Sequence, residues 1–466
     1  MAGSRRDFLK TAGLTGGLLA AGAALAPAAV SAEPLADPWD RVREILARIV
    51  PPRFPDRTFD LRSFGAVGDD KKDNTKAFAS AISACTAAGG GRVLVTGGTY
   101  RTGAIHLRSN VDLHVTAGST IKFSASASAF PAVYTRWQGI ECVNYSPFVY
   151  ARGQTNLALT GAGTIDGNAQ AGPWFDYDGR RGPDWDRLQQ MAVDGVPVEK
   201  RRFGDGHYLK PNMIQFYDCR NILVEGLSLR NPAMWTVHPV LSENVTVRDV
   251  KIHSRGAMVD GVDPESCADV HIHHCSFDTG DDGTVIKSGR DTDGRRVGVP
   301  SERIVIEDND YHGRWGAITI GSEMSGGVRD VFAQRNRIHQ GSSYKAFYGL
   351  YLKTNKRRGG VIENIHVRDL SGGPVDRGAI FVDMNYSLTG PGFGDIVHPV
   401  IRNIDARDIR LDDSPFALKI AGSPESPLTG FRLADSAFTN IDTPKPQISN
   451  AKNVVISNVK VNGKPL

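Results

Sequence analysis

The chain has 466 residues with 51 glycines, 25 prolines and 5 cysteines, and its 55 basic and 51 acidic groups leave a formal charge of +4. Five cysteines are too few for a disulfide scaffold, so the core has to hold without covalent links. Basic and acidic residues are interspersed without a long basic run, which excludes a nucleic-acid-binding signature. The length fits either about three domains or one elongated repetitive domain.

The first 32 residues have the pattern of an export signal. Arg5 and Arg6 precede a weakly apolar stretch, and small residues end it at 30–32, where cleavage is expected. The stretch is rich in Ala and Gly and contains Pro27, so it is a poor membrane span. We therefore expect a twin-arginine signal peptide over 1–32 and a periplasmic or secreted mature protein that is not in a membrane. An uncleaved anchor is the alternative.

Residues 33–57 are predicted to be a leader segment with an amphipathic stretch near 39–49. After it, Asn74 or Thr75 can cap a helix that runs to about Cys85. This helix is the expected N-terminal cap of the domain. Strands follow it at 92–95, 104–107, 111–115 and 120–123.

Short alternating strands recur from there to the C-terminus, and a polar residue usually opens each one. The opening residues Asn221, Asn244 and Asp269 are 23 and 25 residues apart. A repeat of this length without a helical pattern between the strands is typical of a β-helix, whose rungs stack by ladder hydrogen bonds. We predict an all-β protein, a single parallel β-helix over 58–466 with a short helical cap, and keep a β-sandwich as the alternative. The later predicted strands are 157–160, 222–225, 245–248, 270–273, 304–307, 362–367, 401–406 and 454–459.

A long insertion, 168–210, interrupts this repeat. Loops of that length in a compact fold are usually functional, and insertions on a solenoid gather on one face. Its aromatic side chains either stack on sugar rings or only pin the loop to the coils: Trp174, Tyr177, Trp185, Phe203 and Tyr208.

Three aspartates form the densest cluster of reactive groups. Asp260 and Asp281 are 21 residues apart, close to one coil, which places their backbones on neighbouring rungs. Asp282 follows directly, and adjacent residues of a regular strand point in opposite directions. Repulsion separates the pKa values of clustered carboxyls, so one can stay protonated while another is ionised, as glycoside hydrolysis requires. A calcium site and ordinary Asp-Gly turns are the alternatives.

Two further groups carry weaker signals. His271 and His273 share one strand face, so a metal is conceivable there, although solvent-facing histidines are the simpler interpretation. Cys267 and Cys275 could pair after export.

The sequence resembles glycoside hydrolase family 28, the polygalacturonases, over most of residues 58–464. The resemblance implies a right-handed parallel β-helix and hydrolysis with inversion. It implies that Asp281 is the general acid and that Asp260 and Asp282 hold and activate the water. The motifs that carry it are Phe64–Asp69 with Asp73–Thr75, Gly163–Gly167, Asp260–Pro264, Thr279–Asp282 and Gly321–Gly327.

Two binding motifs of the family are altered in this sequence. The histidine of its Gly-His-Gly motif falls at Trp315 or Gly316, and the arginine of its Arg-Ile-Lys motif is Tyr351. Of the cation pair that holds the uronate carboxylate in the family, only Lys353 remains. Arg314 is a candidate replacement, since a guanidinium can hold a carboxylate in a fork. Tyr351 and Trp315 would suit a sugar face or hydroxyl.

A third departure concerns the first catalytic aspartate. The asparagine and threonine that usually precede it are Met258 and Val259, a more apolar surround that could raise the pKa of Asp260. Further candidates for substrate binding are His312, Asp263, His238 and Lys210, and for the last two a place on the coil surface is the alternative.

These features predict an exported inverting glycoside hydrolase that cleaves uronate-containing plant polysaccharide such as polygalacturonan or rhamnogalacturonan. It is expected to be exo-acting, because the insertion at 168–210 would close one end of the groove. We expect a monomer that binds polysaccharide or oligosaccharide but no nucleic acid, and that uses no metal and no cofactor. The alternatives are a β-helical polysaccharide lyase, which Arg314 and Lys353 make conceivable, and a non-catalytic carbohydrate-binding solenoid.

Overall fold

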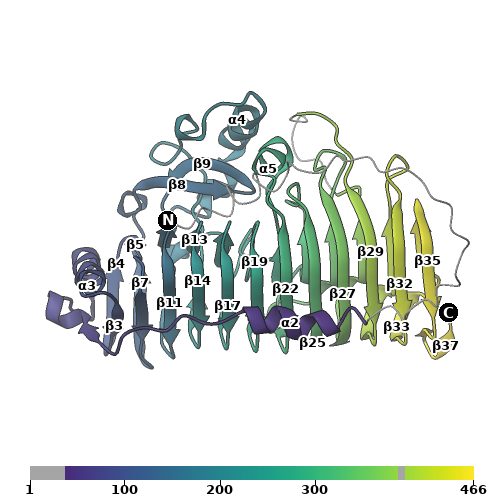
Figure 1. Cartoon of the computed structure of the whole chain (residues 1–466), viewed down its shortest axis with the longest axis horizontal. Coiled ribbons are helices and arrows are strands. Elements are labelled where there is room, and N and C mark those ends of the chain that lie inside the picture. The colour runs from purple at the N-terminus through teal and green to yellow at the C-terminus, as the bar shows by residue number, and fades with distance from the viewer. Residues whose placement is uncertain (1–36, 387–393) are drawn as a thin grey trace, which may run out of the picture.

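Strands repeat along the chain and wind it into a right-handed parallel β-helix, which the computed structural model describes over residues 37–386 and 394–466. The coils stack along the long axis of the molecule (Figure 1). The predicted fold class is confirmed, and the long parallel sheets exclude the β-sandwich alternative. The signal peptide predicted over 1–32 lies outside the described residues.

The strands of successive coils fall into three rows whose neighbours pair in parallel, except at the C-terminal end, and one separate hairpin is antiparallel. The third row is interrupted once, where isolated bridges at Val262 and Glu265 link one coil to the next. The first row consists of β1 (Thr58–Asp60), β3 (Gly91–Val95), β6 (Val111–Val115), β11 (Thr155–Gly161), β14 (Arg220–Glu225), β17 (Glu243–Arg248), β19 (Ala268–His273), β22 (Ser301–Glu307), β25 (Val328–Ile338), β27 (Val361–Gly372), β29 (Val400–Arg407), β32 (Leu428–Ala434) and β35 (Ala451–Ser457). The second row, which β25 and β27 also enter, consists of β2 (Asp69–Asp73), β4 (Gly98–Thr102), β7 (Ser119–Phe123), β12 (Thr164–Asp166), β15 (Ser228–Arg230), β18 (Lys251–His253), β20 (Ser276–Asp278), β23 (Asp310–Tyr311), β30 (Arg410–Phe416), β33 (Ala437–Thr443), β36 (Lys460–Val461) and the antiparallel β37 (Lys464–Pro465). The third row consists of β5 (Ile105–His106), β10 (Val149–Arg152), β13 (Ile214–Tyr217), β16 (Val237–Val240), β21 (Thr284–Ile286), β24 (Gly316–Gly321), β26 (Ala346–Lys353), β28 (Val375–Asp383), β31 (Leu418–Ala421) and β34 (Gln447–Ser449).

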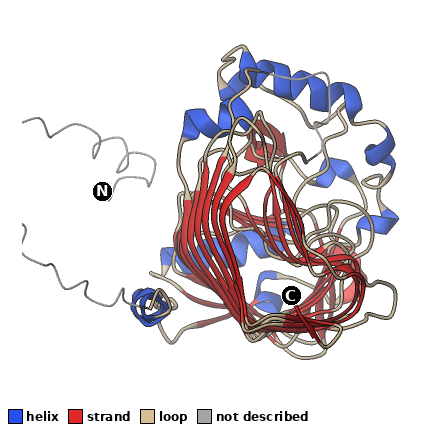
Figure 2. Cartoon of the chain, turned by 90° about the vertical axis from the view of Figure 1, so that its right-hand side faces the viewer, coloured by secondary structure: helices blue, strands red, loops and turns tan. Residues whose placement is uncertain are grey.

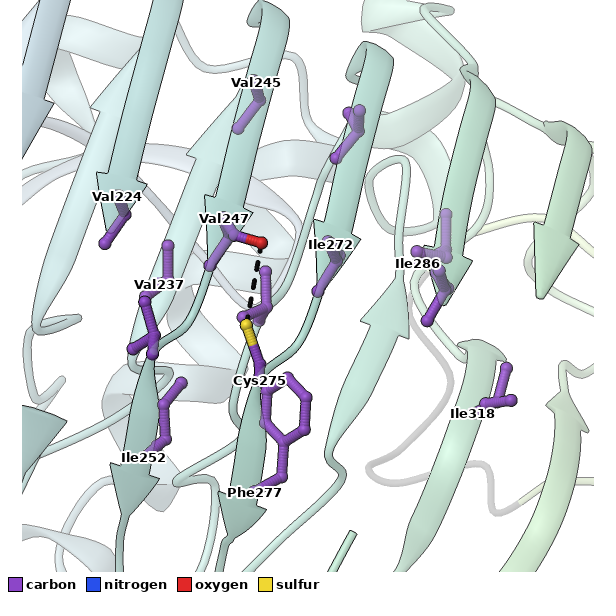
Figure 3. Packing of buried hydrophobic residues seen from close by; sticks show 14 of the residues in the cluster. Val224, Val237, Val245, Val247, Ile252, Ile272, Cys275, Phe277, Ile286 and Ile318 are labelled. Atoms are coloured by element: carbon purple, nitrogen blue, oxygen red, sulfur yellow. Dashed lines mark hydrogen bonds between the residues drawn. The ribbon is translucent and has the colours of Figure 1, made fainter. Parts of the chain in front are cut away.

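The interior is filled by aliphatic side chains that stack from coil to coil. Val224, Val247, Ile272 and Ile306 are paired in register on four neighbouring strands, and each has no exposed surface. Figure 3 shows the first three of these side chains within the same cluster. Burial of each such side chain contributes roughly 1.5–3 kcal/mol, so the repeated period-two pattern is what stabilises the coil.

The polar residues that open the first-row strands form a ladder. Asn110, Asn156, Asn221 and Asn244 stand on successive coils with φ of 66°, 58°, 55° and 56°. The side-chain amide of each of the last three donates to the preceding asparagine at 2.8–2.9 Å. Asparagine adopts a positive φ more readily than most residues, which explains the polar residue at this place in each repeat.

Helix α3 (Thr75–Ala87) covers the N-terminal end of the coil, as predicted, and buries Phe78, Ile82 and Cys85 (Figure 1). Asn74 precedes the helix as expected, but its side chain makes no hydrogen bond to the first turn. The Asn74 amide instead bridges the preceding loop, accepting from the Val67 backbone N–H at 2.8 Å.

The leader contains helix α2 (Asp40–Arg48), which lies along the outer face of the first strand row (Figures 1 and 2). Its apolar face packs against Val305 and Phe332. Arg41 and Arg48 bind the coil carboxylates Asp330 and Asp269 at 2.7 and 2.9 Å. Among the described helices, none is both long and apolar enough to span a bilayer.

The insertion forms a lobe beside the third strand row, and more of the chain contributes to it than predicted. The antiparallel hairpin β8 (Ala132–Trp137) and β9 (Ile140–Tyr145) joins α4 (Gly182–Val193) and α5 (Asp291–Val297) there (Figure 1). The aromatic residues of 168–210 mostly pack inward: Trp174 has no exposed surface, and Trp185 packs on Trp137 with ring centroids 4.9 Å apart. They therefore pin the lobe to the coils.

All five cysteines are buried, and none forms a disulfide. The expected pairing of Cys267 with Cys275 is wrong, because they stand at opposite ends of β19. That strand has six residues and spans roughly 20 Å, whereas a disulfide needs Cα atoms within about 7 Å.

Candidate active site

The three aspartates meet at the N-terminal end of β21, in the third strand row. The Gly261 N–H donates to the carbonyl of Asp282 at 2.9 Å, so Asp260 and Asp282 occupy equivalent positions on neighbouring coils. One carboxylate oxygen from each of the three lies within 4.8 Å of the others. The spacing of one coil therefore does bring the cluster together.

Asp282 is held by donors on both of its oxygens. Oδ1 accepts from the Gly316 N–H at 2.8 Å and from the Thr319 hydroxyl at 3.1 Å. Oδ2 accepts from the Lys353 ammonium at 2.6 Å, and the Asp282 side chain is 1% exposed. Although burial acts against the ammonium, Asp282 holds the pKa of Lys353 well above its usual value. These three donors hold the Asp282 carboxylate in place beside the Lys353 ammonium.

Asp281 is partly exposed. One of its oxygens accepts from the Met258 N–H at 2.9 Å and the other from the Asp282 N–H at 3.0 Å. Burial and the neighbouring Asp282 charge raise the pKa of Asp281 to about 6, although Lys353 opposes the shift. Asp281 is the partly exposed member of the cluster, and its raised pKa of about 6 lets it carry a proton under mildly acidic conditions.

Asp260 is more deeply buried, with 3% exposure. Burial and the nearby charges of Asp263 and Asp281 raise its pKa well above the usual carboxyl value. The Lys287 ammonium lies 3.7 Å from a carboxylate oxygen of both Asp260 and Asp263 and counters the shift. The pKa of Asp260 is raised as the apolar Met258 and Val259 suggest, but carboxyl neighbours also contribute.

Glu323 and the cations around it were missed by the sequence analysis. Glu323 is 6% exposed, accepts from Lys287 at 3.1 Å and contacts the Arg290 guanidinium. Although burial opposes it, Lys287 and then Arg290 hold the pKa of Glu323 well below its usual value. The only signal was its place inside the Gly321–Gly327 motif, which gives no contact with Lys287.

The aspartate oxygens could also serve as ligands for a cation. Ammonium groups already stand at two of them, however: Lys353 on Asp282 and Lys287 beside Asp260. The arrangement is therefore better suited to proton transfer than to a calcium ion.

The altered family motifs lie next to the acids. An added Cβ at Gly316 would stand 2.1 Å from the Thr319 hydroxyl, so this position has no room for a histidine. Trp315 is partly exposed, and its ring lies 6.0 Å from the Lys353 ammonium. Tyr351 is 3% exposed and stacks on Phe381.

The other candidates contact neighbouring rings or are buried. Arg314 is exposed and lies over the Phe347 ring at 5.0 Å, and His312 stacks on His339. Direct substrate contact by His238 and Asp263 does not fit this structure, because neither has any exposed surface. His238 instead bonds Glu265 at 2.7 Å and the Gln215 amide at 3.1 Å.

Lys210 links the lobe to the acids and is not a coil-surface residue. It is fully buried, and its ammonium donates to Asp178 at 2.8 Å and to the Ala257 carbonyl at 3.1 Å. Met258, whose N–H binds Asp281, is buried among Trp137, Trp185 and other apolar residues of the lobe. The lobe therefore stands as a wall directly beside the Asp281 carboxyl.

A parallel β-helix that carries clustered carboxyls, one of them with a raised pKa and another bound to an ammonium group, is typical of enzymes that cleave polysaccharides by acid–base chemistry. The sequence model of Glycosyl hydrolases family 28 matches residues 85–460. The chain belongs to this family and is a glycoside hydrolase, not a lyase or a non-catalytic solenoid.

Individual relatives agree with the family. A probable polygalacturonase of Vitis vinifera is 30% identical over 388 residues, covering 80% of this chain and 73% of that protein. An exo-poly-alpha-D-galacturonosidase of Dickeya chrysanthemi is 26% identical over 355 residues, covering 71% and 58%. The crystal structure of a hyperthermoactive exopolygalacturonase from Thermotoga maritima is 40% identical, with a TM-score of 0.87 over 92% of this chain and 97% of that one.

Proposed function

We propose that this protein is an exported, inverting, exo-acting hydrolase of polygalacturonate. The observation that carries the proposal is the pairing of Asp281, whose pKa is raised to about 6, with Asp282, whose carboxylate accepts a hydrogen bond from the Lys353 ammonium at 2.6 Å. Similarity to the polygalacturonases of Vitis vinifera and Thermotoga maritima supports galacturonate as the sugar.

In this mechanism Asp281 donates its proton to the glycosidic oxygen as the bond to the anomeric carbon breaks. Asp282 and Asp260 hold a water molecule, and one of them takes its proton while the water oxygen attacks the anomeric carbon from the opposite face. The leaving hydroxyl thus gains the Asp281 proton, and the attacking water loses one to the base. Proton exchange with solvent then returns a proton to Asp281 and removes the one that the base gained.

Inversion has to be tested by the configuration of the first product, because the distances between the carboxyls do not decide it. One oxygen from each of the three aspartates lies within 4.8 Å of the others. This separation between the nearest atoms does not measure the spacing between whole carboxyl groups, which is ~6.5–9.5 Å in inverting enzymes. With inversion, an α-linked substrate would yield a β-anomer as its first product.

The exo mode is supported by the lobe. Residues of β8, β9 and α4 bury Met258 directly beside the acid, and Lys210 ties the lobe to the loop before Asp260. Such a wall would stop a polysaccharide from passing through the site and leave room for a chain end. We also propose that residues 1–32 direct export by the twin-arginine route and that the mature protein acts as a monomer outside the cytoplasm.

The test is a digest of polygalacturonate followed by chromatography and by NMR of the first product. The wild type is expected to release small products of one size from the start, with inverted configuration. Asp281→Asn is expected to lose nearly all activity while its unfolding temperature is unchanged. Early mid-chain fragments would contradict the exo mode, a retained anomer would contradict inversion, and an active Asp281→Asn would remove Asp281 as the acid.

A further inference from the structure

The face next to the acids carries aromatic side chains that the chemical steps above do not use. Trp315, Phe347, Tyr348, Tyr351, Phe381 and Phe416 form one cluster, which we call the aromatic strip. Its members lie on or just before β24, β26, β28 and β31, which follow β21 in this order along the third row. The strip therefore runs from Asp282 toward the C-terminal coils. The coils that carry Asp260 and the residues before it lie on the other side of Asp282.

The strip is continuous with the catalytic cluster. The Lys353 ammonium, which binds Asp282, lies 5.4 Å from the Tyr351 ring. Tyr351 stacks on Phe381 with centroids 5.5 Å apart, and Phe381 meets Phe416 at 6.0 Å. Trp315, Phe381 and Phe416 are the partly exposed rings of the strip, whereas Phe347, Tyr348 and Tyr351 are nearly covered. A sugar chain that has one residue at Asp281 would extend past the exposed rings, one coil of about 4.8 Å after another.

Three cations lie on this strip. The Arg377 guanidinium is 3.9 Å above the Phe347 ring and hydrogen bonds to Tyr348. Arg314 lies 5.0 Å from the Phe347 ring, and Lys419 lies 5.3 Å from the Phe381 ring. Within residues 37–386 and 394–466, none of the three has a carboxylate at ion-pair distance.

The opposite face of the coil is different. Arg329 pairs with Glu302, and Arg335 pairs with Glu307 and Asp308. These arginines are paired with carboxylates of the protein, whereas Arg314 and Arg377 on the strip have no carboxylate partner among the described residues. A guanidinium that lies flat on an aromatic ring still presents the edge that binds a carboxylate in a fork.

A uronate residue offers both partners that this surface lacks: an apolar sugar face for the rings and a carboxylate for the cations. We propose that Arg377 binds the carboxylate of a uronate residue that lies on the strip, beyond the residue being cleaved, and that Lys419 binds the next one. This assignment rests on the proposed action on polygalacturonate. Arg377, on the coil that follows Tyr351, would then determine specificity together with Arg314.

The test compares Arg377→Ala, Arg377→Lys and the control Arg43→Ala, which removes an equally exposed charge from α2 on another face. On trigalacturonate, Arg377→Ala is expected to raise KM about tenfold with kcat within about twofold, as for loss of one charge-assisted contact. Arg377→Lys should recover part of the affinity, and Arg43→Ala should match the wild type. Fully methyl-esterified trigalacturonate, which has no carboxylate charge, should be insensitive to Arg377.

Calorimetric titration of trigalacturonate into Asp281→Asn, with and without Arg377→Ala, separates binding from turnover. Weaker binding in the double variant supports the assignment even if the wild type releases no product, which would overturn only the proposed function. Equal affinity with and without Arg377, or an equal loss for the esterified trimer, overturns the role of Arg377. Matching unfolding temperatures for the variants exclude misfolding as the cause.

Discussion

Asp281 carries the pH dependence expected of this enzyme. Its folded-state pKa of about 6 stands above the ordinary value of 3.8, chiefly because of burial and the Asp282 charge. As the acid it has to be protonated, so kcat/KM is expected to fall about tenfold per pH unit above 6. Initial rates on trigalacturonate between pH 4 and 8 check this, and a flat profile from 5 to 7 would contradict it.

The same shift has a consequence for stability. Between 3.8 and about 6 the native state binds the Asp281 proton more tightly than the unfolded chain does. The contribution of Asp281 to stability is therefore lost as pH rises through this window. The clustered carboxyls titrate together, so the observed midpoint belongs to the group rather than to one side chain.

At the scale of residues, the sequence predicts which groups gather but not which way they point. Asp260 and Asp281 come together because their spacing matches one coil. Asp263 has no exposed surface and lies 3.7 Å from the Lys287 ammonium, so it belongs to the buried charge network rather than to the substrate-facing surface that its motif suggests. Glu323 reaches Lys287 from a position 36 residues further along, a contact that no local pattern encodes.

At the scale of elements, the asparagine ladder makes a prediction about stability. Asn221 donates to Asn156 and accepts from Asn244, both at 2.8 Å, and its φ is 55°. Asn221→Ala loses two hydrogen bonds and places alanine in the left-handed region, a cost of about 3 kcal/mol in the free energy of unfolding. Chemical denaturation measures it.

Asn221→Gly is the matched control for the backbone. Glycine adopts a positive φ without steric cost, so this variant should lose mainly the ladder and be less destabilised than Asn221→Ala. Equal stability of wild type and Asn221→Ala would show that the ladder adds nothing to the stacking of coils.

The predicted elements differ in how well the sequence defines them. First-row strands such as β6 and β19 follow from period-two alternation that the core enforces. The hairpin β8–β9 was missed, although Gln138 and Gly139, both with positive φ, form a two-residue turn between alternating segments. Its packing partners lie in α4 and near Arg290, far along the chain, so the lobe is defined by contacts rather than by local pattern.

For the whole molecule, the repeat of about 24 residues was sufficient to predict the architecture. One apolar cluster runs from Leu61 to Val461, and each coil adds its side chains to it. A core of this kind grows with the number of coils instead of saturating as in a compact domain, which explains how a chain of 466 residues needs no covalent link.

That continuous core predicts a redox-insensitive protein. Each of the five thiols is at most 2% exposed, and burial raises the pKa of Cys85 to about 11 and of Cys219 and Cys275 to about 12. A buried, protonated thiol is a poor nucleophile, so the native protein should not react with a disulfide reagent at neutral pH. After denaturation without reductant, all five thiols should titrate, and dithiothreitol should leave the unfolding temperature unchanged. Fewer than five thiols, or a drop in unfolding temperature on reduction, would show that a disulfide forms and that stacked coils alone do not hold this fold.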